Sequence, residues 1–286
     1  MPKTLLILIN FRTNTVKYAF IVGLLVLPLL LQMLGTHWVR IADTCLLYIM
    51  MALGMNIVVG YAGLLDLGYV AFYAVGAYIF TLLASPHLIE SFAWIAASFP
   101  AGLHAPWWLT IPLAAILAAI LGVLLGAPTL RLRGDYLAIV TLGFGEIVRI
   151  FINNLGHPIN ITNGARGIVQ IDSISIFGVE VGKSLFLGNY EIASVTLYYY
   201  LFLALTALIV IVCKRLQDSR IGRAWMAIRD DEIAAEAMGI NTRNLKLLAF
   251  CMGASFGGIA GAMFASFQGF VSPESFSLME SVIIVA

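Results

Sequence analysis

The chain places one charged loop between two long apolar stretches. From residue 194 to residue 213 it reads SVTLYYYLFLALTALIVIVC, and from 247 to 270 it reads LLAFCMGASFGGIAGAMFASFQGF. Between them, residues 214–246 read KRLQDSRIGRAWMAIRDDEIAAEAMGINTRNLK. This segment, the charged loop, holds seven of the 16 Lys and Arg residues and five of the 15 Asp and Glu residues. Because about 20 apolar residues span a bilayer core, the pattern predicts two membrane-spanning helices joined by a loop in water.

The composition of the whole chain agrees with a membrane protein. It is 61% hydrophobic and 11% charged, whereas a soluble domain carries about 25% charged residues. The net charge of +1 gives no basis for a nucleic-acid partner. We therefore expect an all-α integral membrane protein, with residues 1–286 forming a single polytopic helical bundle.

Seven apolar runs are long enough to be spans, and an eighth begins at Ser281 and stops at Ala286. Six residues do not cross a bilayer, so we expect a truncated eighth span and at least one further span in the native protein. The seven predicted spans are Tyr18–Leu34, Ile41–Val59, Tyr61–Ala84, Trp107–Ala127, Tyr136–Asn153, Ser194–Cys213 and Leu247–Phe270.

The distribution of Lys and Arg predicts the orientation, because these residues concentrate in cytoplasmic segments. With the N-terminus in the cytoplasm, the inside segments hold the seven cations of the charged loop together with Lys3, Arg12, Lys17, Arg131 and Arg133. The outside segments hold only Arg40, Arg166 and Lys183. The charged loop is then cytoplasmic.

Residues 154–193 form the longest external connection in this orientation. Apolar residues alternate with polar ones on both sides of Gly178 (Ile174 and Ile176 before it, Val179 and Val181 after it). Such alternation around a glycine predicts a small external β-hairpin.

The charged loop contains a short predicted helix. Asp230 is a suitable N-cap for a helix of about eight residues that begins at Asp231, and Gly239 suits the position just after its end. Ile233, Ala237 and Ile240 then share one apolar face. Two interpretations are open at this point: a helix lying on the membrane surface, or a helix that inserts into a groove of a cytoplasmic partner.

Three motifs resemble a known family. Residues 223–239, RAWMAIRDDEIAAEAMG, resemble the EAA loop of ABC importer permeases. Residues 130–149, LRLRGDYLAIVTLGFGEIVR, and 268–276, QGFVSPESF, resemble the permease family of ABC-type branched-chain amino acid transporters, and within it the M-subunit type. The resemblance extends from Ile41 to the end of the chain.

This resemblance implies a non-catalytic, multi-pass permease of the bacterial inner membrane that imports leucine, isoleucine or valine. The implied partners are a homologous second permease subunit, two cytoplasmic ATPase subunits that bind ATP and Mg, and a periplasmic substrate-binding protein. This chain itself is expected to bind no cofactor.

The EAA loop implies a coupling helix seated in an ATPase cleft. In this chain Ile233 holds the position of the family's consensus Glu, and Glu232 lies one residue earlier, so the resemblance supports no salt bridge from the consensus position. The docking residues that it implies are Arg223, Trp225, Arg229, Asp230, Asp231, Glu232, Ile233, Ala234, Ala235, Glu236 and Gly239.

Charged residues inside spans cost about 2.5–3.5 kcal/mol each on insertion scales, so they should face protein or water. Glu146 and Arg149 are three residues apart and can pair on one helix face. The pair is interpreted as a buried ion pair that fixes packing, as a polar lining or outer gate of a translocation path, or as interfacial. Gly143 and Gly145 are predicted to loosen the same span and to offer helix ends to a zwitterionic substrate.

Asp66 is the other predicted intramembrane acid, and it lies between Gly63 and Gly68. It either satisfies backbone donors freed by a broken or re-entrant segment, or contacts substrate or a partner.

Gly253, Gly257 and Gly261 form a small-residue ridge. That ridge packs either within the chain or against the second permease.

No arrangement of residues predicts catalysis or a metal site. Residues 178–184 read GVEVGKS, with three residues between the glycines where a phosphate-binding loop has four. Two alternative functions remain: a permease of the same family for urea or short-chain amides, and a self-sufficient secondary transporter or channel.

Overall fold

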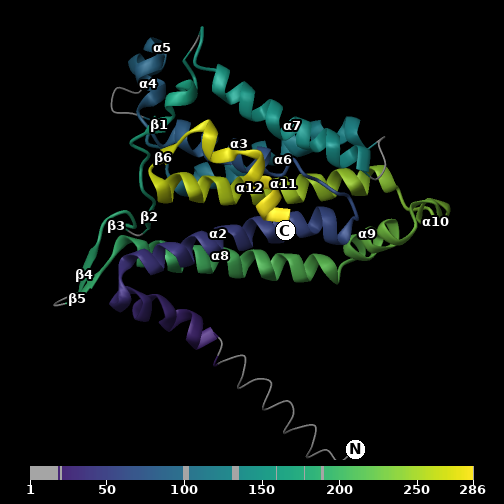
Figure 1. Ribbon diagram of the computed structural model, residues 1–286, viewed down its shortest axis with the longest axis horizontal. Helices are drawn as coiled ribbons and strands as arrows, with labels where there is room; N and C mark the ends of the chain where they lie inside the picture. The colour runs from purple at the N-terminus through teal and green to yellow at the C-terminus, as the bar shows by residue number, and fades with distance from the viewer. Residues whose placement is uncertain are drawn as a thin grey trace, which may run out of the picture.

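Helix α11 (Thr242–Gln268) runs through the middle of a bundle of long helices (Figure 1). The computed structural model describes Ala19 and residues 21–98, 103–130, 135–158, 160–176, 178–187 and 190–285. An apolar helix, Ile21–Leu34, precedes α2. The other helices are α2 (Thr36–Asn56), η1 (Ile57–Tyr61), α3 (Val70–Leu83), α4 (His87–Ser91), α5 (Ala93–Ser98), α6 (Trp107–Thr129), α7 (Asp135–Asn154), η2 (Gly164–Arg166), α8 (Ser194–Gln217), α9 (Arg220–Asp230), α10 (Glu232–Ala237), η3 (Pro273–Phe276) and α12 (Leu278–Val285).

Five helical stretches of the described chain are long and apolar enough to cross a membrane. Each of them overlaps one predicted span, and the two shorter apolar helices, Ile21–Leu34 and Val70–Leu83, lie within the first and third predicted spans. The protein is therefore a polytopic helical membrane protein. The five stretches are Thr36–Tyr61, Trp107–Thr129, Tyr136–Asn154, Ser194–Gln217 and Thr242–Gln268.

The third predicted span, Tyr61–Ala84, is shorter than expected. The π-helix η1 ends at Tyr61, residues 62–69 are not helical, and α3 begins only at Val70. Gly63 has a φ of 70°, a left-handed conformation that breaks the helix and that glycine adopts without steric cost. The segment is therefore broken, as expected for one of the alternatives around Asp66, and α3 covers only the later part of the predicted span.

The apolar run that starts at Ser281 belongs to α12, which begins three residues earlier, at Leu278. After α11 ends, the chain pairs with β1, forms η3 and then enters the bundle, where α12 contacts α2, α3 and α7 (Figure 1). The Phe276 side chain is buried beside Tyr73 and Tyr78. The 268–276 motif thus returns the chain to the core.

The glycine ridge of α11 packs within the chain. A Cβ atom at Gly253 would lie 2.6 Å from Val58 Cγ2 of η1 and 3.1 Å from the Gly54 carbonyl oxygen of α2. At Gly258, which follows the ridge residue Gly257, a Cβ atom would lie 2.6 Å from the Ala118 Cβ of α6. A Cβ atom at Gly261 would collide with the backbone of Tyr73 in α3. The absence of side chains thus lets α2, α3 and α6 approach α11 closely, which agrees with the first of the two interpretations of the ridge.

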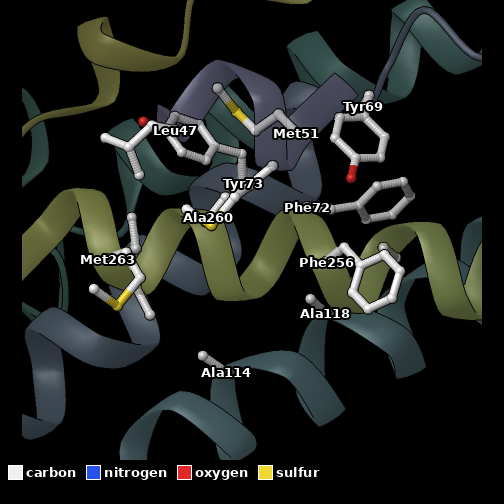
Figure 2. Close-up of a cluster of buried hydrophobic side chains, with 14 of the residues drawn as sticks. Leu47, Met51, Tyr69, Phe72, Tyr73, Ala114, Ala118, Phe256, Ala260 and Met263 are labelled. Atoms are coloured by element: carbon white, nitrogen blue, oxygen red, sulfur yellow. The ribbon is translucent and has the colours of Figure 1, made fainter. Parts of the chain in front are cut away.

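The core lies around α11. Figure 2 shows Phe256, Ala260 and Met263 of α11 between aromatic side chains of α3 on one side and the alanines of α6 on the other. The Tyr69 hydroxyl donates a hydrogen bond to the Gly253 carbonyl over 2.9 Å, which ties the start of α3 to α11.

Among the residues that the structure describes, three two-stranded antiparallel sheets lie at or near the end of the bundle opposite α9 and α10 (Figure 1). The predicted hairpin is confirmed: β2 pairs with β3 in the register Ser175↔Glu180 and Ile176↔Val179. The other two sheets were not predicted. The strands are β1 (Ile168–Val169), β2 (Ser175–Ile176), β3 (Val179–Glu180), β4 (Leu185–Leu187), β5 (Tyr190–Ile192) and β6 (Phe270–Val271).

We expect Gly261→Ala to destabilise the bundle by about 1–3 kcal/mol, because the added methyl group overpacks the α3–α11 contact. The measurement is the thermal unfolding midpoint of the purified protein in detergent.

Gly143→Ala is the matched control, because a Cβ atom there meets nothing within 4 Å. This variant should be as stable as the wild type or up to about 1 kcal/mol more stable. Equal melting of both variants would contradict the close packing of α11 on α3.

Candidate functional site

The charged loop folds into a tight turn and two short helices. Ser219 caps α9: its Oγ accepts a hydrogen bond from the Gly222 backbone N–H over 3.1 Å. A side chain at Gly222 would collide with the backbone carbonyls of Leu216 and Gln217 at the end of α8. Glycine at this position therefore allows α9 to fold back directly from α8.

One face of α9 packs on the chain itself. Trp225 is fully buried, and its indole N–H donates to the Leu245 carbonyl of α11 over 2.7 Å. Ile228 is buried on the same face. Trp225, which the motif placed among the docking residues, therefore anchors α9 to α11 and is not at the surface.

The cap of α10 is Asp231, so the prediction that Asp230 caps a helix beginning at Asp231 is wrong. Asp231 has an extended backbone, and its Oδ1 accepts from the N–H groups of Ile233 (2.9 Å) and Ala234 (3.1 Å). Asp230 is the last residue of α9. The helix consequently begins at Glu232 and has six residues, not eight.

The predicted glycine at the end of α10 is confirmed. Gly239 has a φ of 83°, its N–H donates to Glu236 O, and the next N–H, of Ile240, donates to Ala235 O. These two bonds form a Schellman motif, which satisfies the last carbonyls of the helix.

Glu232 fastens α10 to α11. Its Oε1 lies 2.6 Å from Lys246 Nζ, and the Lys246 side chain is only 10% exposed. Ala235 is buried on the same side of the helix. The orientation of α10 relative to α11 is therefore fixed by an ion pair and a packed methyl group.

The opposite face of α10 is exposed and apolar. Ile233 is 71% exposed and Met238 is 84% exposed. Ala234, Glu236 and Ala237 are also exposed. Met238 was not among the predicted site residues. Its position directly before Gly239, at the exposed end of α10, could have indicated it.

Two basic residues of α9, Arg223 and Arg229, are also exposed. The Arg223 Nη1 is 3.4 Å from the Asp218 carbonyl. Arg229 is paired with Asp230 only at 3.8 Å, and its Nη1 donates to the Gly60 carbonyl over 2.6 Å. A Cβ atom at Gly63 would lie 2.6 Å from Arg229 Cγ. Arg229 thus joins the charged loop to η1 and to Gly63 of the broken segment, residues 62–69.

Side chains from two other helices satisfy the backbone of that segment. The Leu67 N–H donates to Thr141 Oγ1 of α7 over 3.0 Å, and the Ser281 hydroxyl of α12 donates to the Leu67 carbonyl. The Gly68 N–H donates to Asp66 Oδ1 over 2.9 Å. Asp66, only 1% exposed, therefore satisfies a freed backbone donor, the first of its two interpretations.

Glu146 and Arg149 form the expected pair on α7. Arg149 Nε lies 3.1 Å from both carboxylate oxygens of Glu146, and its Nη2 lies 2.5 Å from Oε1. Their side chains are 34% and 35% exposed. Within this chain the pair therefore lies at the surface of the bundle and is not enclosed between its helices.

The predicted loosening of α7 at Gly143 and Gly145 is wrong. The helix is unbroken from Asp135 to Asn154, so its backbone bonds remain internal and no helix ends are offered to a ligand. Gly145 instead packs closely on Gly68, because a Cβ atom at Gly145 would lie 3.3 Å from the Gly68 Cα. Gly145 and Glu146 line one small pocket with Leu67, and Asp66 accepts the Gly68 N–H, so these three residues meet around residues 67–68. Gly143 does not, because a Cβ atom there meets nothing within 4 Å.

Sequence reasoning also missed Asp43 in α2. It is fully buried, and neither carboxylate oxygen has a hydrogen-bond partner among the residues that the structure describes. Across the same described ranges, no group of three or more His, Cys, Asp or Glu side chains is arranged to hold a metal ion.

Removing the α10 cap should loosen that helix. Asp231→Ala deletes the acceptor of two backbone N–H groups, which costs about 1 kcal/mol and should speed amide hydrogen exchange at residues 233–237 about fivefold. Hydrogen-exchange mass spectrometry measures this rate. The neighbouring Asp230→Ala variant, which removes no cap, is the control; equal acceleration in both would argue against Asp231 as the cap.

The family profile described as "Branched-chain amino acid transport system / permease component" matches residues 37–286. The high-affinity branched-chain amino acid transport system permease protein LivM of Escherichia coli K12 is 43% identical over 298 aligned residues, which cover 100% of this chain and 65% of that protein. LivM of Salmonella typhimurium is 42% identical with the same coverage.

More distant relatives match as well. The permease protein LivH of Escherichia coli K12 is 24% identical over 229 residues, 79% of this chain and 68% of that protein. The chain spans 65% of the length of the two LivM relatives. No solved structure gave a significant match.

Proposed function

The chain belongs to the family of branched-chain amino acid transport system permease components, and we propose that it is the permease subunit of an ATP-driven importer of leucine, isoleucine and valine. The observation that carries this proposal is the exposed apolar face of α10 on a chain of this family. A transport permease needs no catalytic group of its own, and ATP with Mg is bound and hydrolysed on separate subunits.

The proposed assembly contains a homologous second permease subunit, two ATPase subunits and a periplasmic substrate-binding protein in the bacterial inner membrane. A permease of the LivH type, to which this chain is also similar, is the natural second subunit. No partner is a nucleic acid.

The proposed orientation is the one that the Lys and Arg distribution favours, with the N-terminus and the charged loop in the cytoplasm. The charged loop and the β2–β3 hairpin lie at opposite ends of the bundle, which supports their assignment to opposite sides of the membrane (Figure 1). Lys3, Arg12, Lys17, Arg131 and Arg133 lie outside the described residues. Residues 154–193 are then external, and the whole chain forms one membrane domain.

Helix α10 is the proposed coupling helix. Ile233 and Met238 enter an apolar groove of an ATPase subunit, while Arg223, Arg229, Asp230 and Glu236 lie around the contact. A helix exposing adjacent apolar residues suits such a groove. Trp225 and the Glu232–Lys246 pair hold α9 and α10 against α11, so motion of the docked helix passes to α11 as movement of a rigid unit.

A second connection leads to the membrane segment. Arg229 holds the Gly60 carbonyl, and residues 66–68 contact α7 and α12 through Thr141 and Ser281. Movement of α9 therefore acts directly on the broken segment, next to Asp66, Gly145 and Glu146, where we place the inner part of the translocation path. Glu146 and Arg149 then face that path or the second permease.

Charged substitutions on the exposed face of α10 should prevent docking. Ile233→Asp and Met238→Asp would each bury an unpaired carboxylate in the groove, which should weaken assembly with the ATPase subunits about thirtyfold, as expected for a central interface residue worth about 2 kcal/mol. Pull-down of the ATPase subunits and their ATP turnover measure the effect.

Val169→Asp is the matched control, because Val169 is an exposed apolar residue at the other end of the bundle. It should leave assembly unchanged. Normal assembly and ATP turnover of Ile233→Asp and Met238→Asp would refute the docking proposal.

The substrate is tested with the assembled complex. Binding protein loaded with leucine or valine should stimulate ATP hydrolysis, whereas urea or acetamide should not. Stimulation by urea alone would favour the same-family permease for small amides. Leucine transport by this chain without any ATPase subunit would favour a secondary transporter.

A further inference from the structure

A cavity of about 440 Å³ lies between α2, α11 and the segment from η3 to α12. It extends along α2 from His37, in the first turn of that helix, to Met51. On α11 it is lined from Phe264 to Gln268. Its volume falls within the range of small-molecule sites, about 300–1,000 Å³, and none of the residues discussed above as site residues lines it.

The cavity contains one cation and one anion. The Arg40 Nη2 donates to Gln268 Oε1 over 2.7 Å, and the guanidinium carbon lies 5.2 Å from the centre of the Phe267 ring. The Glu280 Oε2 accepts from the Tyr48 hydroxyl over 2.5 Å. Within the described chain neither Arg40 nor Glu280 takes part in an ion pair, so each charge is held by a neutral partner.

The remaining walls are largely apolar. Leu47 and Met51 of α2 and Tyr73 of α3 are buried and line the cavity. Figure 2 shows these three side chains converging where α2 and α3 face α11. A cavity with one positive group, one negative group and a buried apolar wall matches a molecule that carries all three features.

We propose that this cavity is a transit site for a zwitterionic aliphatic amino acid. Arg40 binds the carboxylate, Glu280 binds the ammonium group, and the aliphatic side chain lies against Leu47, Met51 and Tyr73. This inference rests on the proposed function and specifies where the substrate is held.

Ligand binding exchanges neutral contacts for charged ones. The Gln268 amide and the Tyr48 hydroxyl are replaced at Arg40 and Glu280 by a carboxylate and an ammonium group, and hydrogen bonds between ionised partners are the stronger kind. The planar guanidinium suits a carboxylate, which it can bind through two parallel bonds. Urea carries neither charge, so it forms no charged contact with Arg40 or Glu280.

The test is leucine uptake by the complete transporter in proteoliposomes. Glu280→Gln keeps an acceptor for Tyr48 but removes the charge, and Arg40→Gln removes the cation. Each should lower uptake at least about tenfold, the effect of losing a hydrogen bond between charged groups, while assembly and ATPase stimulation by leucine-loaded binding protein persist. Glu90→Gln and Arg166→Gln, which neutralise exposed charges outside the cavity, should transport normally.

A second pair of variants serves if neutralisation impairs folding. Thr44 lines the cavity and Cys45 does not, although both are on α2. Thr44→Trp should block uptake by filling the cavity, whereas Cys45→Trp should not.

The outcomes separate the two proposals. If Arg40→Gln, Glu280→Gln and Thr44→Trp all take up leucine at the wild-type rate, the proposed site is refuted and the proposed function is not. A wild-type complex that carries no amino acid refutes the proposed function and, with it, the site.

Discussion

The structure depends on how the broken backbone of residues 62–69 is satisfied inside a helical bundle. A chain that crosses a bilayer finds no water to bond to free N–H and C=O groups, so irregular backbone persists only where protein supplies the partners. Here the partners are Thr141 from α7, Ser281 from α12 and the segment's own Asp66. Arg229 of α9 contributes a further bond, to the carbonyl of Gly60 just before the break. Four parts of the chain therefore meet at one point because this segment does not form the regular backbone hydrogen bonds of a helix.

The central position of α11 follows from a different physical effect, the close van der Waals packing of helices. In lipid, helices gain little from burying apolar surface, so close van der Waals packing has to hold them together. The glycines of α11 permit that approach on several sides, toward Val58, Tyr73 and Ala118. The same helix continues into the charged loop, where it accepts the Trp225 indole and pairs Lys246 with Glu232. A rigid connection thus runs from the exposed face of α10 to the core of the bundle.

Local patterns predicted what depends on local physics. Apolar length located the spans, alternation around Gly178 located the β2–β3 hairpin, and Gly239 located the end of α10 because that position requires a positive φ. The exact cap of α10 was missed by one residue, since two adjacent aspartates are equally good caps until the backbone of one becomes extended. The prediction that Gly143 and Gly145 loosen α7 was wrong because glycines in a packed helix do not have to break it.

The sequence by itself determined the membrane class, the order of the spans, the exposed charged loop and the family, because these depend on composition, periodicity and motif. Only the tertiary structure decided that Trp225 is buried and that Asp66 accepts a hydrogen bond from a backbone N–H group. It also decided that Arg40 and Glu280 line one cavity, although they stand near opposite ends of the sequence. These properties depend on which helices become neighbours, and that choice is made by close packing and by the need to satisfy buried polar groups, neither of which a linear pattern records.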